Sequence, residues 1–202
     1  MIRRFAADDV ESCVHIVHEA FRDDPLYVHM MQSDDEKLGF AKFLIRKALL
    51  LKELLIVALR DGEIVGIASL EKTSGNTFKS LLSVLKWSFI KEALLLKKSI
   101  SGDRFDFINQ YMRYTTAVRP KTPHHYLVFV GVLPAYQKQG VGREILEYLH
   151  GIVDADESSA GIGLDTENEI NVVYYMHFGY EVIATKRIDD VDVYVMFRKR
   201  KE

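Results

Sequence analysis

The residues best suited to do chemistry form one stretch, VGVLPAYQKQGVGR, which runs from Val130 to Arg143. A buried strand is expected to end here, and glycines at positions 140 and 142 then stand at the start of a helix. A glycine has no Cβ, so a ligand can approach the backbone closely. The unpaired N–H groups of a helix start, together with the helix dipole, attract phosphate oxygens. With Lys138 and Arg143 as additional charged groups, the stretch predicts a ligand that carries phosphate.

Two well-known phosphate motifs do not fit this stretch. A P-loop requires Gly-Lys-Ser/Thr after a longer gap, and the sequence contains none. A dinucleotide-binding turn requires a third glycine at the position that Ile145 occupies. Taken by itself, the Gly-x-Gly pattern is therefore typical of an ordinary turn between a strand and a helix.

The elements that must position this turn alternate between strands and helices, which predicts an α/β fold with a mixed sheet. Asp8 is expected to cap the first helix, and Asp23-Asp24-Pro25 to end it. Arg60-Asp61-Gly62 joins two apolar runs and predicts an antiparallel hairpin. The expected strands are 2–5, 54–59, 63–70, 125–132, 160–165, 180–185 and 191–198. The expected helices after the first are 34–53, one from about 140 to 153, and 171–178.

The segment from about 72 to 120 interrupts this order. Its apolar residues between 78 and 89 recur at helical spacing, and lysines supply the polar positions. We expect a helical insertion that packs as a wall or lid over the acceptor side of the site. The alternative is an amphipathic helix that lies on a membrane surface or on a partner protein.

The flanking residues add a resemblance to a known family. Gln137-x-x-Gly140-x-Gly142, preceded by Val132-x-Pro134, resembles the acetyl-CoA signature of the GNAT N-acetyltransferases. Residues 171–180, NVVYYMHFGY, are similar to that family's Asn, Tyr and Gly-Phe ending, with Tyr180 in place of Phe. The resemblance implies a mixed, mainly antiparallel central sheet flanked by helices, in a single domain over 1–202.

The resemblance also implies an acetyl-CoA site. Backbone groups of Val130 and Val132 would hold the pantetheine arm, and Asn171 would contact it. The turn would bind the pyrophosphate, and Tyr175 would be the general acid for the leaving thiolate, with Tyr174 as a competitor. The residues implied to contact acetyl-CoA are Val130, Gly131, Val132, Gln137, Lys138, Gln139, Gly140, Val141, Gly142, Arg143, Asn171 and Tyr175.

The reaction would be direct attack of a neutral amine on the thioester, which requires a base because alkylamines have a pKa near 10.4. Many relatives place a carboxylate on the strand before the turn, and that position falls on Tyr126 here. His124 and His125 could accept the proton, or they could simply be polar residues at the strand entry. Asp165 and Glu167 are further candidates, although capping of the next helix or solvation is the expectation for both.

Composition limits the other classes of function. The 202 residues carry 27 Lys plus Arg against 29 Asp plus Glu, a net charge of −2, so we expect no nucleic-acid partner. The single cysteine excludes an intramolecular disulfide and a cysteine-based zinc site, so we expect a cytoplasmic protein without a metal. No apolar run is long enough to cross a membrane.

Three functions remain open from the sequence. The first is an acetyl-CoA-dependent N-acetyltransferase whose acceptor is a small-molecule or peptide amine. The second is a non-catalytic acyl-CoA-binding sensor of the same fold, and the third is a structural protein that uses the insertion to bind a partner. A homodimer formed by edge pairing of the last strands is compatible with each of them.

Overall fold

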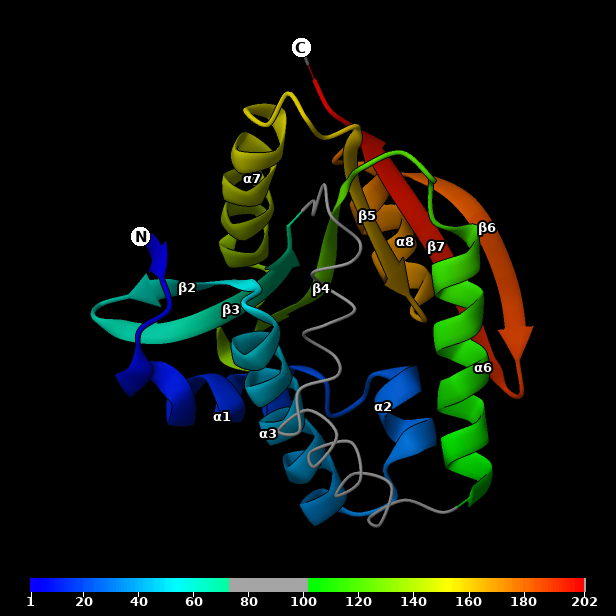
Figure 1. Ribbon diagram of the computed structural model, residues 1–202. Helices are drawn as coiled ribbons and strands as arrows, with labels where there is room; N and C mark the ends of the chain where they lie inside the picture. The colour runs from blue at the N-terminus through cyan, green and yellow to red at the C-terminus, as the bar shows by residue number, and fades with distance from the viewer. Residues whose placement is uncertain (73–101, 202) are drawn as a thin grey trace.

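The computed structural model describes residues 1–72 and 102–201, and these form a seven-stranded sheet in the order β1-β2-β3-β4-β5-β7-β6 (Figure 1). Every neighbouring pair of strands is antiparallel except β4 and β5, which are parallel. The predicted mixed, mainly antiparallel sheet is therefore confirmed. The strands are β1 (Ile2–Arg4), β2 (Leu54–Arg60), β3 (Glu63–Glu71), β4 (His125–Val132), β5 (Gly161–Thr166), β6 (Glu181–Ile188) and β7 (Val191–Lys199).

Helices cover both faces of the sheet. α7 and α8 pack on one face, and their buried side chains join those of β2 to β5 and β7 in the largest core cluster. α1 and α3 cover the other face of β2, β3 and β4. α2, α6 and the β6–β7 hairpin enclose a third, smaller cluster. The helices are α1 (Val10–Ala20), α2 (Pro25–Met30), α3 (Asp34–Leu51), α6 (Gly102–Val118), α7 (Val141–Asp154) and α8 (Glu169–Met176).

Local sequence accounts for the elements around the site. In β4 an apolar run spans both core layers, with Leu127 in one cluster and Phe129 in the other. In α7 the buried positions Val141, Ile145 and Leu149 recur every four residues, so one stripe of the helix faces the sheet. The β2–β3 hairpin forms as predicted, with Asp61 and Gly62 both at positive φ (50° and 86°).

Two expectations at the front of the chain are wrong in detail. A 3-10 turn, η1 (Ala7–Asp9), precedes α1, so Asp8 is not the cap. The reason is that the Asp9 carboxylate is held by Arg3 (2.6 and 2.8 Å) and by the Ala6 N–H (2.7 Å). The second expectation is that Asp23-Asp24-Pro25 ends the first helix. α1 already ends at Ala20, and Asp24 caps a further helix, α2, that begins at Pro25 and was not predicted.

The described part of the predicted insertion is α6, which lies beside β6 in Figure 1. Arg104 of α6 donates to the carbonyl of Met30 (2.7 Å) and to the carboxylate of Glu36 (2.7 Å), so the helix is tied to α2 and α3. The predicted helical stripe at 78–89 lies outside the described residues.

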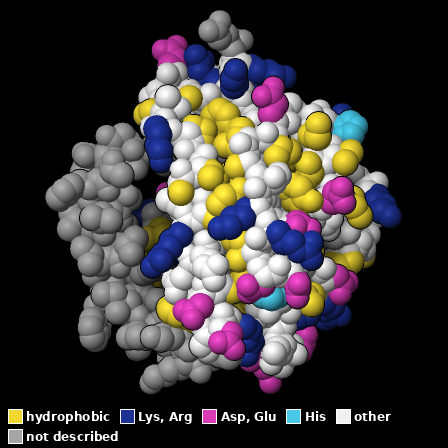
Figure 2. Space-filling view, turned by 90° about the vertical axis from the view of Figure 1, so that its right-hand side faces the viewer, with side chains coloured by type: hydrophobic (Ala, Val, Ile, Leu, Met, Phe, Trp, Pro, Cys, Tyr) yellow, Lys and Arg dark blue, Asp and Glu magenta, His cyan; other side chains and the backbone are white. Residues whose placement is uncertain are grey.

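β6 forms one edge of the sheet, and most of its side chains are exposed, including Val182 and Ile183. Figure 2 views the molecule from this side, where hydrophobic side chains lie between charged side chains of both signs. The edge is open to pairing, and the homodimer stays a prediction.

Candidate functional site

The central feature of the site is the divergence of β4 from β5. The two parallel strands pair only at His125 with Ile162 and at Tyr126 with Gly163. Beyond these pairs β4 continues alongside β3 while β5 continues alongside β7, and the two backbones separate (Figure 1). The second half of β4 therefore has a free edge inside the sheet.

The backbone direction along β4 can be read from one hydrogen bond. The N–H of Leu133 donates to Val65 O of β3 (2.9 Å). Because backbone groups alternate along a strand, the N–H and C=O groups of Val132 and Val130 face the opposite way, toward the separated β5. The carbonyl of Val132 instead accepts from the side-chain amide of Gln137 (3.1 Å). These are the two backbone positions that the sequence assigned to the pantetheine arm.

The turn after β4 leaves several N–H groups unpaired. Gly140 is the N-cap of α7 at φ 84°, and its lack of a side chain leaves the helix start uncapped. The first intrahelical bond runs from the Glu144 N–H to Gly140 O (3.0 Å). No described residue accepts a hydrogen bond from the N–H groups of Val141, Gly142 or Arg143. A 14-residue helix thus presents its positive end to solvent, as a phosphate site requires.

Side chains around the turn leave room for a ligand. The residues from Gln137 to Gly140 are exposed, and Lys138 has a left-handed backbone (φ 59°). A Cβ at Gly142 would lie 3.2 Å from the hydroxyl of Tyr174, so glycine lets this phenol approach the first turn of α7 closely. A Cβ at Gly131 would lie 3.1 Å from that of Ala20, because β4 and α1 pack closely there.

Tyr175 and Tyr174, the two candidates for the general acid, differ in burial. Tyr175 lies in the main core cluster and is 8% exposed, whereas Tyr174 is 40% exposed. The Tyr175 hydroxyl forms no hydrogen bond with any described residue, and burial raises the pKa of its phenol far above 10. A buried phenol without a protein partner is suited to donate its proton to a bound ligand.

A cluster of carboxylates and phenols lies at the end of β5. The Tyr111 hydroxyl of α6 contacts Glu167 Oε1 (2.6 Å) and the carboxylate of Asp165. The hydroxyl of Tyr126 donates to the other oxygen of Asp165. Burial and the charges of Asp165 and Asp24 raise the pKa of Glu167 well above its usual 4.5. The expectation that Asp165 and Glu167 are solvated or cap a helix is wrong, since the contacts are to α6 and β4.

Helix α8 is capped by Asn168, whose side chain accepts from the Ile170 N–H (3.0 Å). Asn171, which the sequence assigned to pantetheine, lies in the first turn of the helix and is partly buried. Its contact with pantetheine stays a prediction.

The two histidines predicted as bases lie at the opposite end of β4. His125 is buried, and its ring pairs with Asp156 (2.9 Å), while burial lowers its pKa. The Nδ1 of His124 pairs with Thr122 O (2.7 Å), and its ring packs against Phe197. Both lie where β4 and β5 are still paired, and this placement does not favour either as the base.

Comparison with known proteins gives the family. The model of the acetyltransferase (GNAT) family matches residues 5–180. The chain belongs to the GNAT family. As a member, it is an acetyl-CoA-dependent N-acetyltransferase, and the resemblance drawn from the turn and from α8 is confirmed.

Individual relatives are more distant. An uncharacterized N-acetyltransferase of Schizosaccharomyces pombe is 25% identical over 98% of this chain and 82% of its own length. N-alpha-acetyltransferase 50 of Danio rerio is 31% identical over 35% of this chain and 46% of its own length. A histone acetyltransferase HPA2-related structure from Corynebacterium glutamicum has a TM-score of 0.68 at 22% identity, covering 100% of this chain and 97% of that one. This last similarity supports the fold.

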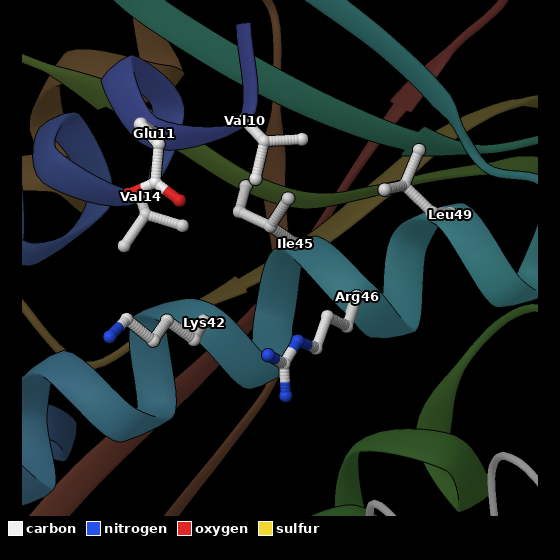
Figure 3. A pocket seen from close by; sticks show the side chains of 7 residues that line it. All are labelled: Val10, Glu11, Val14, Lys42, Ile45, Arg46 and Leu49. Atoms are coloured by element: carbon white, nitrogen blue, oxygen red, sulfur yellow. The ribbon is translucent and has the colours of Figure 1, made fainter. Parts of the chain in front are cut away.

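One pocket of this GNAT acetyltransferase lies away from the turn. Figure 3 shows it between α1 and α3, with side chains of Val14 and Ile45 inside and those of Glu11, Lys42 and Arg46 at its margin. Its volume is about 160 Å³. α1 and α3 cover the face of the sheet opposite α7, so the pocket and the buried face of α7 lie on opposite sides of the sheet. Within the described residues, no helix has the length and apolar character needed to cross a membrane.

Proposed function

We propose that the protein transfers an acetyl group from acetyl-CoA to the primary amine of a small molecule or peptide, by direct attack within a ternary complex. The observation that carries the proposal is the free edge of β4, which leads directly into the uncapped start of α7 with the unpartnered hydroxyl of Tyr175 nearby.

The residues fit acetyl-CoA in two ways. The free backbone groups of Val130 and Val132 can pair with the amides of pantetheine as an added strand would. The N–H groups from Val141 to Arg143 can bind the pyrophosphate, with Lys138 as an additional charge. The amide of Gln137 leaves Val132 O when a substrate amide takes its place.

Chemistry follows from the placement of Tyr175. The amine nitrogen attacks the acetyl carbonyl, the C–N bond forms and the C–S bond breaks. Tyr175 donates its proton to the leaving sulfur. Since burial keeps this phenol protonated at neutral pH, the proton is present when the thiolate forms.

No covalent enzyme intermediate is needed. Cys13 lies in α1 with no exposed surface, and burial raises the pKa of its thiol to about 12. A thiol that is fully protonated and inaccessible does not act as a nucleophile.

The acceptor is proposed from the protein's relatives and from the charge of the site. N-alpha-acetyltransferase 50 resembles part of this chain. The structure of Chaetomium thermophilum Naa20 with a bisubstrate analogue shares the fold, with a TM-score of 0.53 and 17% identity over 99% of this chain and 86% of that one. Peptide amines therefore belong in the search beside small amines. The carboxylates around Glu167 favour an acceptor that arrives as a cation.

The test measures thiol release from acetyl-CoA in the presence of small amines, peptides with free N-termini and peptides with a lysine side chain. Turnover with at least one amine supports the proposal. Stabilisation by acetyl-CoA without thiol release from any amine would instead support an acyl-CoA sensor, and failure to bind acetyl-CoA would exclude both.

A further inference from the structure

Tyr126 of β4 stands where the family resemblance led us to expect a carboxylate. The hydroxyl of Tyr126 nevertheless contacts a carboxylate, since it donates to Asp165 on the neighbouring strand. Arg119 stacks on the Tyr126 ring, with its guanidinium carbon 3.3 Å from the ring centroid. The carboxylates of this region therefore lie at the end of β5 and directly after it, at Asp165 and Glu167.

Hydrogen counting shows that Glu167 keeps acceptor capacity. The hydroxyl of Tyr111 has one proton, yet it lies within hydrogen-bond distance of both Glu167 and Asp165, so it donates to only one of them at a time. Asp165 also accepts from Tyr126, so its charge remains compensated when Tyr111 donates to Glu167. Glu167 can therefore be ionised before the acceptor binds and can then take up a proton.

The cluster faces the reaction site. Asp165 and Glu167 follow Gly163, the last residue of β5 that pairs with β4, so the cluster lies where the two strands separate. Tyr175 belongs to the core cluster against which Val130 and Val132 of β4 pack, and its hydroxyl has no partner among the described residues. A carboxylate and a free phenol on this side of β4 are the groups that a base and an acid for the proposed reaction require.

We propose that Glu167 is the base that deprotonates the acceptor amine, and that Tyr111 connects it to Asp165 so that the proton can be passed on. This rests on the proposed function. The ammonium group of the acceptor gives one proton to Glu167 and attacks as a neutral amine. As the C–S bond breaks, Tyr175 gives its proton to sulfur, and the second proton of the nitrogen restores the Tyr175 phenol. Glu167 then passes its proton to solvent, so each turnover releases one proton.

The surroundings of Glu167 suit this task. A carboxylate at its ordinary pKa is too weak a base for an alkylammonium ion, and each rise in its pKa improves the transfer. Burial provides most of the rise, and nearby negative charge provides the rest. The titratable or charged groups around it are Asp165 at the end of β5, Asp24 at the start of α2, Tyr111 on α6, Tyr175 on α8, and Tyr126 with Arg119 beyond Asp165.

The experiment compares Glu167→Gln with Glu169→Gln. The first retains the shape of the side chain and the contact with Tyr111, and the second changes an exposed carboxylate two residues away. With an alkylamine acceptor at pH 7, we expect kcat/KM of Glu167→Gln to fall about 100-fold or more, while Glu169→Gln matches the wild type. Affinity for acetyl-CoA, measured by calorimetry, should be unchanged in both.

Two further readouts separate a base from a structural residue. In a plot of kcat/KM against pH, the wild-type value should fall at acidic pH as Glu167 takes up a proton. This acidic limb of the profile should be missing in Glu167→Gln, whose kcat/KM should instead rise with pH toward the pKa of the amine. An acceptor whose amine is already neutral at pH 7, such as an arylhydrazine, should restore the variant to near the wild-type rate.

The outcomes are distinct for the two proposals. If the wild type releases no thiol with any amine, the proposed function fails. If the wild type turns over and Glu167→Gln retains its rate and its acidic limb, the assignment of Glu167 is overturned. A variant that is equally slow with alkylamines and with an arylhydrazine also overturns it, because such a loss is structural.

Discussion

Replacing Tyr175 with phenylalanine removes one oxygen atom and leaves the packing of the ring in place. The hydroxyl has no hydrogen-bond partner among the described residues, and the side chain is only 8% exposed. Because this hydroxyl has no hydrogen bond to lose, its removal should leave the free energy of unfolding unchanged to within about 1 kcal/mol.

The effect on catalysis should be large. Loss of a general acid lowers a rate by about 10²–10⁴-fold, which corresponds to about 3–5 kcal/mol in the activation barrier. The measurement is kcat for thiol release at saturating acetyl-CoA and acceptor, together with urea unfolding of the same preparation. A protein that is as stable as the wild type but much slower would identify Tyr175 as a residue retained for function.

Tyr180→Phe is the matched control for this experiment. Tyr180 is also a buried phenol, but its hydroxyl pairs with His150 Nε2 (3.0 Å). This control should lose about 0.5–1.5 kcal/mol of stability and keep its kcat. The reasoning is refuted if Tyr175→Phe turns over at the wild-type rate, or if it is destabilised as much as Tyr180→Phe.

Three other predictions follow from the site and the core. Gly140→Ala places a Cβ at φ 84°, which should lower the free energy of unfolding by about 1–2 kcal/mol in thermal or urea titrations. The variant should also bind acetyl-CoA more weakly in calorimetry. Unaltered affinity would show that this turn does not contact the cosubstrate. Arg198→Met should lower the free energy of unfolding by about 3–5 kcal/mol, because it leaves the carboxylate of Asp154 without its two 2.8 Å hydrogen bonds. Arg198 lowers the pKa of Asp154, so this stabilisation is present above that group's usual pKa of 3.8 and is lost as the pH falls through the lower folded value. Equal losses of stability at pH 7 and pH 2.5 would contradict this. Burial lowers the pKa of His150 to about 4, so the folded protein should lose up to about 3 kcal/mol as the pH falls from 6.5 toward 4, and His150→Gln should reduce that pH dependence in urea titrations.

Local patterns were sufficient to predict the elements that build the candidate site. The apolar run of β4 has the predicted bounds, His125–Val132, because it is buried on both faces. The glycine at 140 marks the start of α7 because its backbone is left-handed and its N–H neighbours need no side-chain cap. A tyrosine four residues before Gly179 lies in the core, as a helix of this register requires.

Long-range contacts account for what the sequence reading missed. Nothing near Glu167 in the sequence indicates that Tyr111, 56 residues away, would meet it. The histidines at 124 and 125 are the more familiar bases, but their position at the paired end of β4 can be read only from the sheet. Asn168 as the cap of α8 had a local signal, since asparagine is a preferred N-cap residue and it precedes the first helical residue, Glu169.

Only two residue pairs join β4 to β5, so the sheet consists of two smaller sheets, β1–β4 and β5–β7, held at one end. With the proposed binding mode, pantetheine supplies the backbone partners that β4 lacks. The cosubstrate then acts as a temporary strand, which pairs with β4 when acetyl-CoA binds and leaves it when CoA is released. Amide hydrogen exchange in the second half of β4 should consequently follow the catalytic cycle more closely than exchange in any strand that is paired on both sides.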